Sequence, residues 1–195
     1  MSDVRVAAGR KIAIISHCFL NQNTKPHQRA RYPGIVTPVL ETIAEAGFAL
    51  MQLPCPEISF AGMNRWSQVI EQYDTPAYRQ HCRTLASQSI DQIEHFLRDP
   101  SFTLVIIGLE GSPSCGIKIT GSSSEWRGYP GDREFDGRYP VKQGTGLFMQ
   151  AIRDEIQRRG LVIPPTLGVG LDLYGIDLDH IGAQLKAELQ QAAAR

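Results

Sequence analysis

The sequence predicts an α/β fold: a single domain over residues 1–195, in three layers, with a central and mainly parallel sheet of the Rossmann-like kind. Apolar runs of strand length alternate with amphipathic stretches of helix length along the chain. The strand-like runs are apolar throughout, which is typical of strands covered on both faces. The chain has 195 residues, 42% of them hydrophobic, and this is enough to bury one full core.

The first half of the chain is expected to contain two strands and two helices. The strands are the β-branched or apolar runs at 11–18 and 48–55, each ending where a turn or a proline forbids continuation. A helix is expected over 37–47, with a proline in its first turn and a glycine at its exit. A long helix over 74–98 begins at an Asp-Thr-Pro cap and stops at an Asp-Pro pair. The segment 58–73 shows no clear period.

The second half begins with a third buried strand, at 103–109, which breaks into a turn rich in Gly and Pro. A helix is expected over 144–159, a short fourth strand over 161–165 and a terminal amphipathic helix over 177–195. The longest irregular stretch, 121–140, follows the third strand. A loop of this length is usually a lid or a binding loop, and we expect it to lie over the carboxyl edge of the sheet.

Composition and charge exclude several classes of function. Lys and Arg together number 20, as do Asp and Glu, so the chain lacks the basic excess that nucleic-acid binding uses. No apolar run approaches the roughly 20 residues of a membrane span, and the amino terminus lacks the apolar region of a signal peptide. A cytoplasmic protein with no membrane partner is expected. Four cysteines without a Cys-x-x-Cys pair imply that any metal site is assembled from distant parts of the chain.

Three cysteines lie where an apolar strand gives way to a turn: Cys18, Cys55 and Cys115. The carboxyl ends of parallel strands lie along one edge of the sheet, so these thiols are expected to converge there. Three thiolates are one short of a closed zinc site or a fully ligated cubane cluster, and leave one metal position open for a substrate. A free cysteine can also be a small core residue, but the threefold coincidence favours ligation. Cys82, at helical spacing with apolar residues, is expected to be packing.

Other polar residues close to these cysteines have two interpretations each. Glu57, two residues after Cys55, is either a general acid/base or a solvated loop carboxylate. Glu110 has the same two interpretations, at the end of a buried strand. Ser112 lies in the turn that carries Cys115 and has either a catalytic or a turn-forming role. His17 is expected to point to the opposite side of its strand from Cys18, as a core histidine.

These motifs resemble those of the thiouracil desulfidases. The resemblance rests on Ser112-Pro-Ser-Cys-Gly116, on Cys55-Pro-Glu57 and on a strand-ending cysteine near the amino terminus, and it extends over about residues 11–160. An aromatic-Asp-Gly turn at 135–137 and Gly144-Thr-Gly146 fall where that family has similar features. A displaced Arg-Tyr-Pro-Gly turn at 31–34, and the absence of a glutamate just before the second cysteine, are departures that indicate a diverged branch.

The resemblance implies an enzyme that removes sulfur from a small thiolated compound. In that family a 4Fe-4S cluster is held by three cysteines, which correspond to Cys18, Cys55 and Cys115, and the family's catalytic serine corresponds to Ser112. Glu57 or Glu110 would be the acid/base. The alternative from another class is a non-catalytic iron–sulfur or metal-binding protein, such as a sensor or a sulfur carrier.

Overall fold

Four parallel strands form the central sheet, in the order β2-β1-β3-β6. The computed structural model describes residues 9–26, 29–125, 140–171 and 178–194. The strands are β1 (Lys11–Ile15), β2 (Ala49–Gln52), β3 (Thr103–Leu109) and β6 (Thr166–Val169). The two central strands, β1 and β3, are almost wholly buried, as their apolar sequences require. The predicted pairing of the first three strands within one parallel sheet is confirmed.

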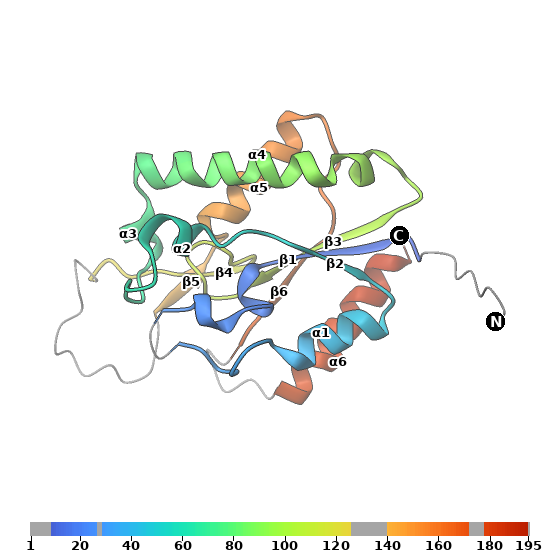
Figure 1. The fold of residues 1–195 in the computed structure, drawn as a ribbon, viewed down its shortest axis with the longest axis horizontal. Coiled ribbons are helices and arrows are strands. Elements are labelled where there is room, and N and C mark those ends of the chain that lie inside the picture. The colour runs from blue at the N-terminus through green and yellow to red at the C-terminus, as the bar shows by residue number, and fades with distance from the viewer. Residues whose placement is uncertain (1–8, 27–28, 126–139, 172–177, 195) are drawn as a thin grey trace, which may run out of the picture.

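Helices cover both faces of this sheet (Figure 1). On one face lie α1 (Thr37–Glu45) and α6 (Leu178–Ala193), which contact each other. On the other lie α4 (Pro76–Arg98) and α5 (Leu147–Arg158), which form the most extensive helix–helix contact in the described part of the chain. The predicted three-layer α/β fold is therefore confirmed.

The long helix α4 starts and stops where the sequence predicts. Thr75 accepts a hydrogen bond from the amide of Tyr78 at 3.2 Å, and Pro76 follows in the first turn, where a missing N–H does no harm. The helix buries one stripe against the sheet, made of Tyr78, Cys82, Ala86, Ser89, Ile90 and Ile93. Cys82, only 1% exposed, is confirmed as a packing residue of that stripe.

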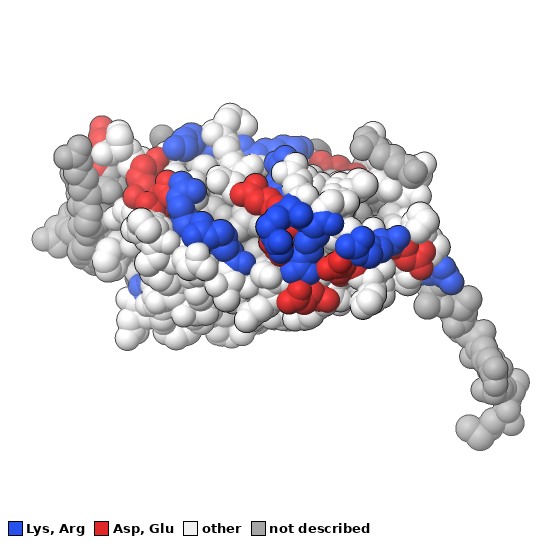
Figure 2. All heavy atoms as spheres, turned by 90° about the horizontal axis from the view of Figure 1, so that it is seen from above, with Lys and Arg blue, Asp and Glu red and all other residues white. Residues whose placement is uncertain are grey.

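Positive and negative side chains alternate on the face seen from above, around α4 (Figure 2). Many of them are paired: Arg159 contacts Asp91 at 2.8 Å and Glu94 at 2.6 Å, and Arg98 also contacts Glu94 at 2.6 Å. The charges on this face therefore largely neutralise one another. None of the helices in the described ranges is long and apolar enough to cross a membrane.

The last strand of the sheet lies later in the chain than predicted. The expected strand at 161–165 is β6, at Thr166–Val169. Pro164 and Pro165 lack the N–H groups of a sheet ladder, so regular pairing begins after them. The carbonyl of Pro165 still accepts a hydrogen bond from the amide of Ile106 at 2.9 Å, which leads the chain into the sheet.

Several short elements have no counterpart in the sequence prediction. They are two 3₁₀ turns (His17–Phe19 and Gln22–Thr24), the helices α2 (Pro56–Ala61) and α3 (Ile70–Tyr73), and the antiparallel pair of β4 (Ile119–Gly121) and β5 (Val141–Gln143). Each is too short to show a hydrophobic period.

The predicted lid, residues 121–140, lies between β4 and β5, and most of it, at 126–139, is outside the described residues. Its two described ends are attached to α3. Glu71 accepts hydrogen bonds from the Ser122 hydroxyl at 2.5 Å and the Ser123 amide at 3.1 Å, and forms an ion pair with Lys142 at 3.0 Å. These bonds place both ends of the segment against the same short helix.

Candidate cysteine site

Cys18, Cys55 and Cys115 line one pocket at the carboxyl edge of the sheet. Cys18 lies in the 3₁₀ turn three residues after β1, Cys55 directly precedes α2, and Cys115 lies in the turn after β3. The chain leaves β1 towards β2 on one side and enters β6 from β3 on the other. The pocket therefore lies where strand order reverses, which is the position at which open α/β sheets bind ligands.

The turn that carries Cys115 is held by the hydroxyl of Ser112. Its Oγ accepts hydrogen bonds from the amides of Ser114, at 3.2 Å, and Cys115, at 3.0 Å. The Ser112 carbonyl accepts from the amide of Gly116 at 3.0 Å. Ser114 lies deeper, fully buried, and its hydroxyl is hydrogen-bonded to the Tyr78 hydroxyl at 2.7 Å. Ser112 thus fixes the cysteine backbone and also lines the pocket.

Glu110 holds the far side of the same turn. Its carboxylate accepts hydrogen bonds from three successive amides: Ile117 at 3.2 Å, Lys118 at 3.1 Å and Ile119 at 2.8 Å. A Cβ on Gly168 would overlap with this carboxylate, so the neighbouring strand needs a glycine there. Because the acceptor oxygens of Glu110 are engaged by backbone amides, Glu57 is the better candidate for an acid/base.

Glu57 points into the pocket rather than into solvent. Its side chain is 12% exposed and forms an ion pair with Arg65, whose Nε lies 3.3 Å from Oε2. The Tyr73 hydroxyl donates to the same oxygen at 3.4 Å, and the Ser112 hydroxyl donates to Oε1 at 3.5 Å. The interpretation of Glu57 as a solvated loop carboxylate is therefore wrong. Arg65 and Tyr73 also belong to this arrangement, and sequence reasoning missed both because they lie in the segment 58–73, which shows no clear period.

In Gly144-Thr-Gly146, the second glycine lets the start of α5 pack against the cysteine turn. The first amides of α5 donate to the cysteine turn: Leu147 to the Pro113 carbonyl at 2.9 Å, and Phe148 to the Ser114 carbonyl at 3.0 Å. A Cβ on Gly146 would lie 2.7 Å from the amide nitrogen of Cys115, closer than real Cβ atoms approach. Gly146 therefore lets the start of α5 support the backbone that carries the thiol.

We expect Gly146→Ala to destabilise the protein by about 2–3 kcal/mol, because the new methyl group must displace backbone rather than a flexible side chain. Chemical denaturation followed by circular dichroism measures this change. Gly34→Ala is the control, since a Cβ there would meet no atom within 4 Å. Equal stability of the two variants would show that α5 and the cysteine turn do not pack as described.

The side chain of His17 does not lie on the opposite side of the strand from Cys18, as the sequence predicts. β1 ends at Ile15, so the alternation of a strand does not extend to His17 and Cys18, and both line the pocket. The His17 ring is hydrogen-bonded through Nδ1 to the side-chain amide of Gln52. Partial burial lowers its pKa, which favours the neutral imidazole.

Burial dominates the electrostatics of the three thiols. It raises the pKa of Cys18 to about 12, and also raises the pKa of Cys55 and of Cys115. The neighbouring cysteines and Glu57 add to this effect at Cys115, because like charges disfavour each other. Without a bound cation the thiols are therefore protonated at neutral pH. A metal that displaces these protons would relieve the cost of charged sulfur in this site.

The donor set of the pocket consists of three thiols, which are the ligands that iron–sulfur clusters use. Among the described residues, no group of three or more His, Cys, Asp or Glu side chains is arranged to hold one metal ion. One ion would need all its thiolates within about 2.3 Å of a common point, as zinc does. In a cluster each cysteine binds a separate iron, so the thiols can stand further apart. Three soft thiol ligands in one pocket fit that chemistry.

Comparisons with known proteins found one similar sequence and one similar solved structure. No model of a known protein family matches the chain. It is 35% identical, over 109 residues, to the uncharacterized protein MJ0003 of Methanocaldococcus jannaschii, an alignment that covers 56% of this chain and 69% of MJ0003. Among solved structures, the [4Fe-4S]-dependent thiouracil desulfidase TudS aligns with 81% of this chain and 90% of its own, at 19% identity and a TM-score of 0.45.

Proposed function

We propose that this chain, which belongs to the same family as the uncharacterized protein MJ0003, is an iron–sulfur enzyme that removes sulfur from a small thiolated compound. One observation carries the proposal: cysteines from the ends of three parallel strands line one pocket, together with Glu57 and Ser112. The motifs Cys55-Pro-Glu57 and Ser112-Pro-Ser-Cys-Gly116, which resemble those of thiouracil desulfidases, support it.

Cys18, Cys55 and Cys115 are the residues that would hold a 4Fe-4S cluster. With three protein ligands, such a cluster supplies one iron with an open position, a Lewis acid that accepts a soft sulfur donor. All three thiols must lose a proton to bind iron, and each lies in an environment that favours the protonated form. Cluster binding should therefore release protons and weaken at low pH.

The chain itself supplies proton transfer and orientation. Exchange of a thiocarbonyl sulfur for oxygen consumes one water and releases hydrogen sulfide, without oxidant or reductant. In this proposal Glu57 takes a proton from that water and returns it to the leaving sulfur. Arg65 holds one oxygen of the Glu57 carboxylate and the Ser112 hydroxyl holds the other, so that its orientation is fixed before substrate binds.

Anaerobic reconstitution with iron and sulfide tests the proposal. We expect about four irons per chain, the broad absorption of a 4Fe-4S cluster, and release of one sulfide for each uracil formed from 2-thiouracil. A cluster that forms without sulfide release from thiolated pyrimidines would instead favour a non-catalytic sensor or sulfur carrier. Failure to bind iron at all would refute both functions.

A further inference from the structure

His17 lines the cysteine pocket and has no part in the proton transfer proposed above. It is the first residue of the 3₁₀ turn that carries Cys18, and its backbone is anchored in that turn. Its carbonyl accepts hydrogen bonds from the amides of Leu20 at 3.0 Å and Asn21 at 3.1 Å. The ring is therefore attached to a fixed backbone position just beyond the carboxyl end of β1.

Gln52 orients the ring of His17 from the neighbouring strand. It is the last residue of β2 and pairs in register with Ile15, the last residue of β1. Its side-chain nitrogen, Nε2, lies 2.5 Å from Nδ1 of His17. The imidazole is thereby held from two strands, because its backbone follows β1 and its ring is hydrogen-bonded to β2.

The contact with Gln52 decides which ring nitrogen of His17 carries the proton. The NH2 of an amide can only donate, so Nδ1 of His17 accepts this hydrogen bond and carries no proton. The proton of the neutral ring is therefore on Nε2. An imidazolium, with N–H groups on both nitrogens, would oppose two donors at Gln52.

The Nε2–H group of His17 has no acceptor within the described part of the chain. It forms no hydrogen bond or ion pair with a described residue, and it is not among the described side-chain atoms that are buried without a partner. The group is therefore accessible, on a residue of the pocket wall. A polar ligand with a suitable acceptor would take the place of water there.

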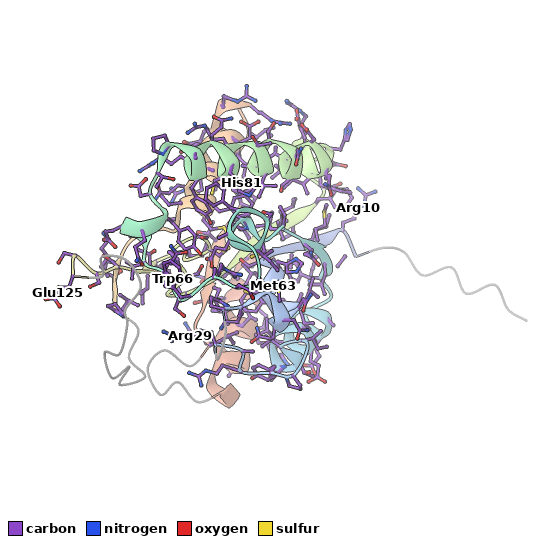
Figure 3. All side chains as sticks on the ribbon, turned by 60° about the vertical axis from the view of Figure 1, so that its left-hand side comes forward. Arg10, Arg29, Met63, Trp66, His81 and Glu125 are labelled. Atoms are coloured by element: carbon purple, nitrogen blue, oxygen red, sulfur yellow. The ribbon has the colours of Figure 1, made fainter. Side chains whose placement is uncertain are left out.

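Other donors of the pocket already have acceptors within the protein. Nε of Arg29 donates to the hydroxyl of Ser67 at 2.9 Å, on the side of the molecule where Figure 3 labels Trp66. The guanidinium of Arg65 donates to a carboxylate and to two backbone carbonyls. These hydrogen bonds stabilise the pocket wall itself, whereas the Nε2–H group of His17 is available to a ligand.

We propose that His17, oriented by Gln52, donates a hydrogen bond to a ring carbonyl of the thiolated substrate and so determines which heterocycles react. The inference rests on the proposed function, since it concerns the choice of substrate at the same site. The thiocarbonyl is the reacting group, so a second polar group on the ring is what the protein can use for selection. A carbonyl oxygen accepts from Nε2–H, whereas an amino group at the same ring position opposes donor to donor.

Binding is measured first, on the anaerobically reconstituted protein, with uracil and cytosine as probes. These compounds are the desulfurated products of 2-thiouracil and 2-thiocytosine and react no further. Cytosine carries an amino group where uracil has a ring carbonyl. We expect calorimetry to show at least about tenfold tighter binding of uracil, and kcat/KM for sulfide release to favour 2-thiouracil over 2-thiocytosine by at least the same factor.

The variants are judged by this ratio, because a purely structural role would affect both compounds alike. His17→Phe should bring the ratio close to one, and His17→Gln, whose amide keeps an N–H donor, should restore part of it. His17 precedes Cys18, so iron content is measured for each variant. Gln52→Leu changes no neighbour of a cysteine in the chain: we expect it to keep its iron and to lower the ratio, because the ring could then present either nitrogen. Gln88→Leu is the matched control, at an exposed glutamine of α4 that does not line the cysteine pocket.

The outcomes separate this inference from the function on which it rests. Equal kcat/KM for the two thiolated compounds in the unaltered protein overturns the inference and leaves desulfidation intact. So does a Gln52→Leu or His17→Phe protein that reacts more slowly with both compounds and keeps their ratio. Tighter binding of uracil that depends on His17 and Gln52, without sulfide release from either thiolated compound, supports the hydrogen bond and refutes desulfidation.

Discussion

Replacing Cys115 by alanine is expected to give a folded protein that no longer retains iron after anaerobic reconstitution and releases no sulfide. Cys115 is one of three thiols in the pocket, and a cluster held by only two protein ligands would dissociate. Cys18→Ala and Cys55→Ala should behave in the same way. Iron content, the absorption spectrum and sulfide release are measured for each variant.

Cys82→Ala is the matched control for this series. Cys82 is more buried than the pocket thiols, and burial raises its pKa to about 12, but it lies on α4 and does not line the pocket. We expect it to keep its iron and activity and to lose about 1 kcal/mol of stability through the small cavity. If Cys115→Ala retained its cluster, the cysteine site and the desulfidase proposal would both have to be abandoned.

Glu57→Gln is expected to retain the cluster while sulfide release per bound iron falls by about 10²–10⁴-fold, the usual contribution of a positioned acid/base. The amide keeps the size of the side chain: its oxygen can still accept from Arg65, and its NH2 can donate to the Ser112 hydroxyl, so the pocket should keep its shape. It cannot take a proton from water. Rates are compared under saturating substrate, after normalisation to iron content.

Glu110→Gln distinguishes a structural carboxylate from a catalytic one. Glu110 accepts three backbone hydrogen bonds, and the loss of its charge should reduce the free energy of unfolding by about 1–3 kcal/mol. Glu57→Gln should mainly lower the rate of sulfide release per bound iron. A Glu57→Gln enzyme with full activity per iron would remove Glu57 from the mechanism and return Glu110 to consideration.

Local sequence signals predicted the framework of the fold well. Apolar runs of strand length specified three of the four sheet strands. For β1 and β3 the reason is burial on both faces, which requires an apolar residue at nearly every position. β2 is an edge strand and most of its residues are exposed, so the expectation that it is covered on both faces is wrong. The limits of α4 followed from Thr75, Pro76 and the Asp-Pro pair after it, which act on the backbone within one turn. β6 was misplaced because apolar character alone cannot show which residues have N–H groups available for pairing.

The sequence by itself determined that three thiols follow parallel strands, and hence that they meet at one edge of the sheet. Only the tertiary structure decided which polar groups join them. Glu57 and Glu110 are equivalent in sequence, but one meets a guanidinium and two hydroxyls in the pocket, whereas the other meets three amides of a turn. A side chain's role here depends on partners 7 to 55 residues away, and such contacts are set by how the chain packs rather than by neighbouring residues.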